Sequence, residues 1–144
     1  MRIITEEIYA MNNAFPLSPD EARFVEAILA PLSARAKHQL TLDDLLQRWN
    51  MFVNQVTQGY DDSIYEYTND LSTRDTLENV LQQAPQPLHD RLNGVLHSID
   101  RRFIDRTTSI QRSLGTSQHP WWFRIPKNLS DELRSDLRSE GIIQ

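Results

Sequence analysis

Apolar residues recur every three or four positions along four stretches of the chain, which is the spacing that places them on one side of a helix. The clearest stretch runs from Gln86 to Ser113 and predicts a helix roughly seven turns long. Its stripe consists of Leu88, Leu92, Val95, Leu96, Ile99, Phe103, Ile104 and Ile110. Long alternating runs of β-branched residues are missing from the sequence, so helices are favoured over sheet.

An earlier helix is predicted to begin at Ser18-Pro19-Asp20-Glu21. Ser18 suits the N-cap, Pro19 suits the first helical position, and Glu21 can complete a capping box. The apolar stripe that follows contains Phe24, Val25, Ile28, Leu29 and Leu32. Because Pro31 falls within that stripe, we expect the helix to kink there or to end by Ala30.

Two more helices are predicted between Thr41 and Pro85. The first begins at Thr41 and ends at Gly59, a residue well suited to a left-handed C-cap. The second begins near Asp61 or Asp62. Its apolar residues before and after Ser72 do not follow one 3.6-residue period, so we expect a bend, a break or a change of buried face near Ser72.

The last part of the chain has a different pattern. Residues 114–118 resemble a loop, His119 to Pro126 is rich in proline and aromatics and predicts an extended strap, and residues 130–141 predict a short helix.

The predicted fold is all-α: an antiparallel up-down four-helix bundle with an extended aromatic strap and a short C-terminal helix. We expect one domain over residues 1–144, with an irregular lead-in at 1–17, a four-helix body at 18–113, and the strap and last helix at 114–144. Mid-stripe positions define the expected core: Phe24, Ile28, Leu45, Trp49, Phe52, Val56, Leu92, Val95, Ile99 and Phe103.

Composition narrows the functional classes. The chain has no cysteine and four glycines, which excludes disulfides and argues against a phosphate-binding loop. The net charge of −5 argues against a general nucleic-acid binder. No run of 18 apolar residues and no secretory leader is visible, so we expect a soluble cytoplasmic protein that does not enter a membrane.

The charges are unevenly distributed. Residues 60–85 sum to −5 with Arg74 as the single base, whereas residues 86–127 sum to +4. The acidic row, defined as Asp61, Asp62, Glu66 and Asp70, rises along one helix with Tyr65 expected beside it on the outward side. The row could pair internally with Arg101 and Arg102. Alternatively, it could face outward and attract a basic partner.

Trp121 and Trp122 allow two interpretations as well. Exposed, they would form a binding hot spot, because tryptophan and arginine often dominate interface energetics. Buried, they would cap the open end of the bundle, with one tryptophan in the core and the other at its edge.

Catalytic and metal chemistry has little support in the sequence. Glu66 and Asp70 lie four residues apart and could hold a cation or a proton. Helical dimetal sites, however, add Glu-x-x-His motifs, and here the four histidines occur singly, at His38, His89, His97 and His119. No Gly-x-Ser-x-Gly elbow is present. We therefore expect no metal, no cofactor and no enzymatic activity.

The sequence thus predicts a protein-binding module, and specifically an immunity- or antitoxin-like inhibitor of a basic toxin or enzyme. The expected contact residues are Asp61, Asp62, Tyr65, Glu66, Asp70, Trp121 and Trp122. One alternative is a small helical enzyme or a ligand- or metal-binding bundle that uses Glu66 and Asp70. Another is a regulatory or scaffold subunit, with a homodimer as one possible arrangement.

Overall fold

The protein folds as a bundle of helices, as the apolar periodicity predicts. The computed structural model describes residues 15–144 and is 68% helical. Within these residues the α-helices are α2 (Pro19–Ala36), α3 (Leu42–Gln58), α4 (Ile64–Gln83), α5 (Gln86–Asp105) and α6 (Asp131–Ser139). Four helices pack together and a short helix follows them, so the all-α prediction is confirmed. Most of the predicted lead-in, residues 1–14, lies outside the described residues.

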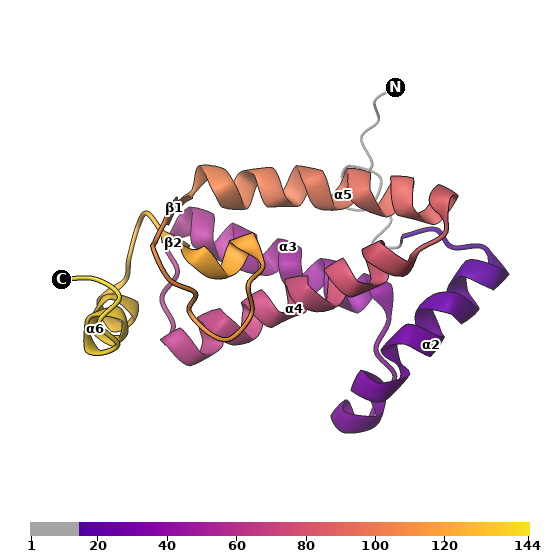
Figure 1. Ribbon diagram of the computed structural model, residues 1–144, viewed down its shortest axis with the longest axis horizontal. Coiled ribbons are helices and arrows are strands. Elements are labelled where there is room, and N and C mark those ends of the chain that lie inside the picture. Colours follow the sequence, from indigo (N-terminus) through magenta and orange to yellow (C-terminus); the bar gives the residue numbers. More distant parts are fainter. Residues whose placement is uncertain (1–14) are drawn as a thin grey trace.

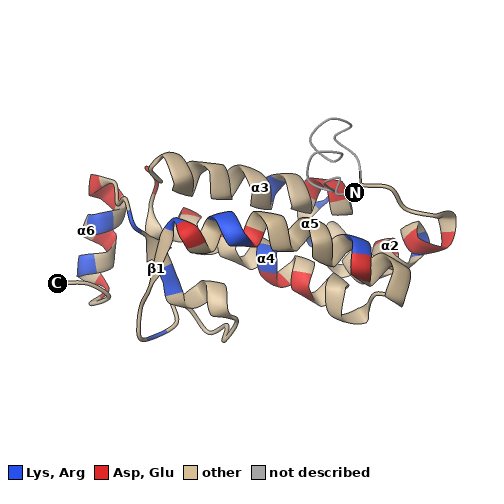
Figure 2. Ribbon diagram, turned by 90° about the horizontal axis from the view of Figure 1, so that it is seen from above, with Lys and Arg blue, Asp and Glu red and all other residues tan. Residues whose placement is uncertain are grey.

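Helices α3, α4 and α5 run side by side and are joined by short connections, so neighbouring helices are antiparallel (Figure 1). Helix α2 is inclined to them at one end of the bundle. Helix α6 lies at the opposite end (Figure 2). No helix within residues 15–144 is both long enough and apolar enough to cross a membrane.

The predicted helix starts are confirmed by their caps. Ser18 Oγ accepts the Glu21 N–H at 3.1 Å, and Glu21 Oε1 accepts the Ser18 N–H at 3.0 Å. Thr41 and Asp44 form the same reciprocal pair at the start of α3. Helix α2 does not end at Ala30 but continues through Pro31 to Ala36. Pro31 is exposed there, and it removes a single backbone hydrogen bond on the solvent side.

The predicted core on α3 and α5 is confirmed. Each of its residues is at most 3% exposed: Leu45, Trp49, Phe52, Val56, Leu92, Val95, Ile99 and Phe103. On α2 the prediction is displaced by one position, because Val25 and Leu29 are buried whereas Phe24 and Ile28 are only partly buried. Because α2 is inclined, the side of its apolar stripe that contains Val25 and Leu29 packs against the bundle.

Helix α5 is shorter than predicted. It ends at Asp105 rather than Ser113, and β1 (Thr107–Ser109) follows. Strand β1 pairs antiparallel with β2 (Arg124–Pro126), with Thr108 opposite Ile125. Adjacent β-branched threonines favour extended backbone, and the buried Thr107 hydroxyl donates to the Phe103 carbonyl at 2.7 Å where the helix ends.

The strap is not extended throughout. Residues Pro120–Phe123 form a 3₁₀ turn, η1, before the chain enters β2. Pro120 occupies the first turn of η1, where a missing N–H is tolerated.

Helix α4 continues through Ser72 without a break, and of the three predicted outcomes the change of buried face is the one observed, because Thr73 and Val80 are buried after Ser72 in addition to the stripe. Its buried stripe contains Tyr67, Leu71, Leu77 and Leu81, and the gap between Leu71 and Leu77 is filled by Arg74, which is 4% exposed. A charged residue thus completes the apolar periodicity.

Candidate functional site

The acidic row lies where α4 begins. Ser63 caps the helix by accepting the Glu66 N–H, and Asp62 accepts the Ser63 N–H at 2.7 Å. Asp61, Asp62 and Glu66 are exposed. Carboxylates are favourable at a helix N-terminus because the helix dipole is positive there. Local helix stability therefore accounts for acids at this place, and it leaves their outer oxygens free to meet solvent or another molecule.

Tyr65 points outward, as predicted, and its residue surface is 80% exposed. Met51 on the neighbouring α3 is 57% exposed. A large aromatic ring and a flexible thioether therefore flank the acidic row without being covered by the described part of the chain. Such side chains are enriched at protein interfaces.

Between α3 and α4 lies an open depression of about 250 Å³, which we call the α4 hollow. Its acidic lining comes from three members of the acidic row, Asp62, Glu66 and Asp70. The rest of the lining is formed by Arg48, Met51, Phe52, Gln55 and Tyr60. Three carboxylates against one guanidinium give the hollow a net negative charge at neutral pH.

Asp70 forms the inner end of the row. It is half-buried and accepts a hydrogen bond from the Tyr60 hydroxyl at 3.2 Å. Burial raises the pKa of Asp70 to about 6, and the nearby carboxylates of Glu66 and Asp62 add to the rise, against the opposing effects of the Tyr60 hydrogen bond and Arg48. Burial and the Asp70 carboxylate also raise the pKa of Tyr60 above its usual range, so Tyr60 remains a hydrogen-bond donor.

The sequence allowed the acidic row to pair with Arg101 and Arg102, and the hydrogen bonds of Asp70 and Arg102 described here are made with other residues. The Asp70 carboxylate is bound by Tyr60, and the Arg102 guanidinium donates to the side-chain oxygens of Asn50 and Asn54 on α3. Within residues 15–144, Arg74 and Asp100 form an ion pair that joins α4 to α5.

Arg74 lies in the core, a position that was not predicted from the sequence. Its Nη2 donates to Asp100 Oδ2 at 2.8 Å, its Nε donates to Asp100 Oδ1 at 3.0 Å, and its Nη1 donates to Glu78 at 3.0 Å. The guanidinium also lies 4.4 Å from the ring centre of Trp121. The available signal was its position, because Arg74 is the single base in an acidic segment and falls in the apolar stripe.

The two strap tryptophans converge on a single carboxylate. The indole N–H of Trp121 donates to Asp75 Oδ1 at 2.7 Å, and that of Trp122 reaches both oxygens of Asp75 at 3.0 Å. Trp122 is buried and Trp121 is half-buried, stacked against His119. One tryptophan is therefore in the core and the other at its edge, as expected of buried tryptophans, but both lie beside the middle of α4 and not at an open end of the bundle. Neither tryptophan lines the α4 hollow, so a partner bound there would not be in contact with them through that hollow. Their role as partner contacts stays a prediction.

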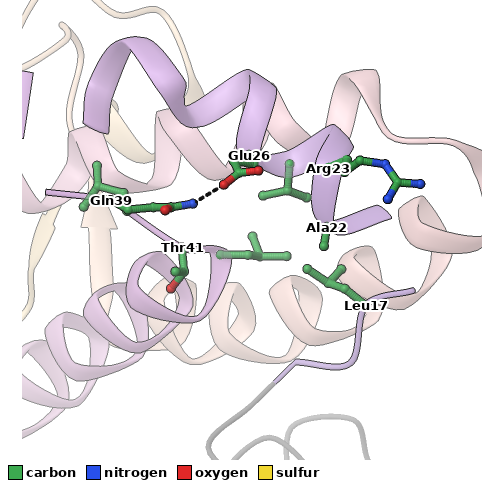
Figure 3. Close-up of a pocket in the computed structure, with 9 residues that line it drawn as sticks. Leu17, Ala22, Arg23, Glu26, Gln39 and Thr41 are labelled. Atoms are coloured by element: carbon green, nitrogen blue, oxygen red, sulfur yellow. Dashed lines mark hydrogen bonds between the residues drawn. The ribbon is translucent and has the colours of Figure 1, made fainter. Parts of the chain in front are cut away.

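A further depression lies at the α2 end (Figure 3). It is lined by Leu17, the start of α2 and the segment before α3. Glu26 and Gln39 are joined across it by a hydrogen bond of 2.5 Å. Glu26 and Gln39 are thus bound to each other, and the depression is a packing seam between the two segments.

Two further searches, for metal-binding groups among residues 15–144 and for similar proteins, identify no additional feature of the site. Within residues 15–144, no group of three or more His, Cys, Asp or Glu side chains is arranged to hold a metal ion. Comparison with protein-family models, curated protein sequences and solved structures gives no match. The chemistry of the surface therefore has to carry the functional inference.

Proposed function

We propose that this protein is a protein-binding module, an inhibitor of the immunity or antitoxin kind, which binds a basic toxin or enzyme through the acidic row. The observation that supports the proposal is the α4 hollow. Exposed carboxylates surround it, and Tyr65 and Met51 are exposed beside them. Asp61, Asp62 and Glu66 form no ion pair with any residue in 15–144.

The charge of the hollow suits a cationic surface. Lysine or arginine side chains of a partner could place their charged ends near Asp62 and Glu66 while their methylene stems lie on Met51. A field of one sign also attracts an oppositely charged partner before contact, which raises the association rate. An inhibitor of a toxic enzyme benefits from fast association, because free toxin acts until it is bound.

The raised pKa of Asp70 fits the same proposal. A carboxylate that is half-buried among other acids costs folding stability at neutral pH. A basic partner would remove part of that cost by placing positive charge beside it. Clusters of unfavourable charge of this kind are frequent at functional sites.

The test compares two variants with the same change in charge. Asp62→Lys with Glu66→Lys reverses the exposed part of the acidic row, whereas Asp105→Lys with Glu140→Lys reverses two exposed acids near the ends of α5 and α6. Each purified protein is mixed with candidate partners, beginning with the product of the neighbouring gene, and the dissociation constant is measured by calorimetry.

We expect the acidic-row variant to bind at least about a hundredfold more weakly than wild type, which is about 2.7 kcal/mol, and the control variant to bind normally. Thermal melts should show both variants folded. Equal binding by wild type and by the acidic-row variant would refute the proposal.

A further inference from the structure

A second depression, the strap hollow, lies between the strap and α5 and has a volume of about 240 Å³. Its apolar wall consists of Trp49, Phe103, Ile104, Pro120 and Trp121. Trp49 and Phe103 belong to the core, whereas Ile104 is 52% exposed although it is a large aliphatic residue. The hollow therefore leads from solvent to the edge of the core along apolar side chains. Two charged residues, Asp100 and Arg124, complete its lining.

The acid in the lining has no capacity left for a ligand. Asp100 accepts the Trp49 indole N–H at 2.8 Å and three further hydrogen bonds from the Nε and Nη2 atoms of Arg74, at 2.8–3.2 Å. A carboxylate has about four lone-pair positions, so these four hydrogen bonds occupy them. Asp100 is therefore committed to the core and does not select an ammonium group or another donor.

The base in the lining is bound on one edge of its guanidinium. Arg124 Nε donates to the Thr107 hydroxyl at 2.7 Å, and Nη2 donates to the backbone carbonyls of Thr107 at 2.9 Å and Ile104 at 3.3 Å. These neutral acceptors use three of the five N–H groups, and the two on Nη1 have no acceptor among residues 15–144. No carboxylate in that part of the chain forms an ion pair with Arg124. Arg124 is thus held in place, half-buried, with its charge and two donors available.

These two residues select the charge of a ligand. A guanidinium whose acceptors are neutral gains most from an ionised acceptor, because charge-assisted hydrogen bonds are roughly twice as strong as neutral ones. A dianion such as a phosphate monoester would bring a second charge, for which the lining residues include no second base, and Asp100 would repel it. A single carboxylate matches the single base.

We propose that the strap hollow binds a small apolar monocarboxylate, of the aromatic or branched aliphatic kind. Its carboxylate accepts from Nη1 of Arg124, and its apolar body packs against Ile104 and Trp121. The hollow is smaller than a typical drug-sized site of about 300–1,000 Å³, so the ligand is small. Burial of the apolar body supplies affinity and Arg124 supplies selectivity for the negative charge. This site is independent of the acidic row.

The experiment follows the indole N–H signals of Trp49 and Trp121, which line the hollow, in ¹⁵N NMR spectra of the full chain at neutral pH. The probe is 3-phenylpropionate. Three analogues test its parts: 3-phenylpropanamide lacks the charge, phenethylamine reverses it, and acetate lacks the apolar body. We expect saturable shifts with 3-phenylpropionate and a dissociation constant of about 5 mM or tighter, as ordinary ligand efficiency gives for a molecule this small. Each analogue should bind at least about tenfold more weakly.

A pair of variants with side chains of nearly the same size separates charge from shape. Ile104→Glu places a carboxylate in the lining beside Arg124, whereas Ile104→Gln places a neutral amide there. Because Ile104 is largely exposed, both variants should remain folded in circular dichroism. We expect Ile104→Glu to bind 3-phenylpropionate at least about tenfold more weakly than Ile104→Gln. Met51→Glu adds the same charge outside the strap hollow and should bind as wild type does.

Three results would overturn the proposal. The first is a dissociation constant for 3-phenylpropionate weaker than about 5 mM. The second is binding of any of the three analogues as tight as that of 3-phenylpropionate. The third is equal binding by Ile104→Glu and Ile104→Gln, which would show that the negative charge of the ligand does not lie near Arg124.

Discussion

Replacing Arg74 by leucine tests the most unusual feature of the core. The Arg74 side chain is 5% exposed and holds Asp100 and Glu78, which are 25% and 16% exposed. Removing one partner from a buried charge network costs about 3–5 kcal/mol, because the remaining charges lose their compensation. Since Asp100 retains some contact with water and the Trp49 N–H, we expect a loss near the lower end, about 3 kcal/mol.

The measurement is urea unfolding followed by circular dichroism. Domains of this size are stable by about 5–15 kcal/mol, so a loss of 3 kcal/mol moves the midpoint clearly while the slope stays unchanged. Arg101→Leu on the exposed side of α5 is the control, with an expected change within about 0.5 kcal/mol.

A combined variant identifies the cause of the loss. Arg74→Leu with Asp100→Asn and Glu78→Gln removes all three charges and retains an acceptor for the Trp49 N–H. We expect it to recover at least about 2 kcal/mol relative to Arg74→Leu alone. A cost below about 1 kcal/mol for Arg74→Leu, or no recovery in the combined variant, would refute the view that Arg74 compensates buried carboxylates.

Three further predictions concern the core, the acidic row and the strap. Phe52→Ala or Phe103→Ala should each cost about 3–5 kcal/mol in urea unfolding, and losses under about 1 kcal/mol would contradict their burial. The folded-state pKa of Asp70, about 6, exceeds the unfolded value of about 3.9, so this carboxyl lowers stability as pH rises from about 4 to 6. Asp70→Asn should therefore stabilise the fold at pH 7.5 by on the order of 1 kcal/mol, after allowance for its solvent contact, and have little effect at pH 4. An equal effect at both pH values would refute this. Asp75→Ala leaves two indole N–H groups without their acceptor and should cost about 1–3 kcal/mol and shift tryptophan emission to longer wavelength; unchanged emission would contradict the binding of both indoles by Asp75.

Local signals predicted most of the fold. The capping pairs at Ser18 and Thr41 depend on residues three positions apart, and the stripes of α3 and α5 depend on one period, so both are readable from sequence. The end of α5 was not readable in the same way. It depends on β1 pairing with β2, which is contributed by a segment about 17 residues further along the chain.

The features of the candidate site likewise fall into those that could be predicted from local sequence and those that depend on distant residues. The positions of Glu66 and Asp70 and the exposure of Tyr65 follow from spacing along α4, whereas Asp61 and Asp62 precede the Ser63 N-cap of that helix. Arg74 in the core and Asp75 beneath two tryptophans do not, because charged residues are normally assigned to the surface. Their burial depends on Asp100 of α5 and on the two strap tryptophans, which are distant in the sequence.

The most direct test of the proposed function is the association rate of the protein with its purified basic partner, measured by stopped-flow fluorescence over a range of salt concentrations. If the acidic row attracts the partner, the rate should fall steeply as the Debye length shrinks below about 8 Å, and the slope should flatten in Asp62→Lys with Glu66→Lys but not in Asp105→Lys with Glu140→Lys. A wild-type rate independent of salt, or the same slope in both variants, would contradict the account.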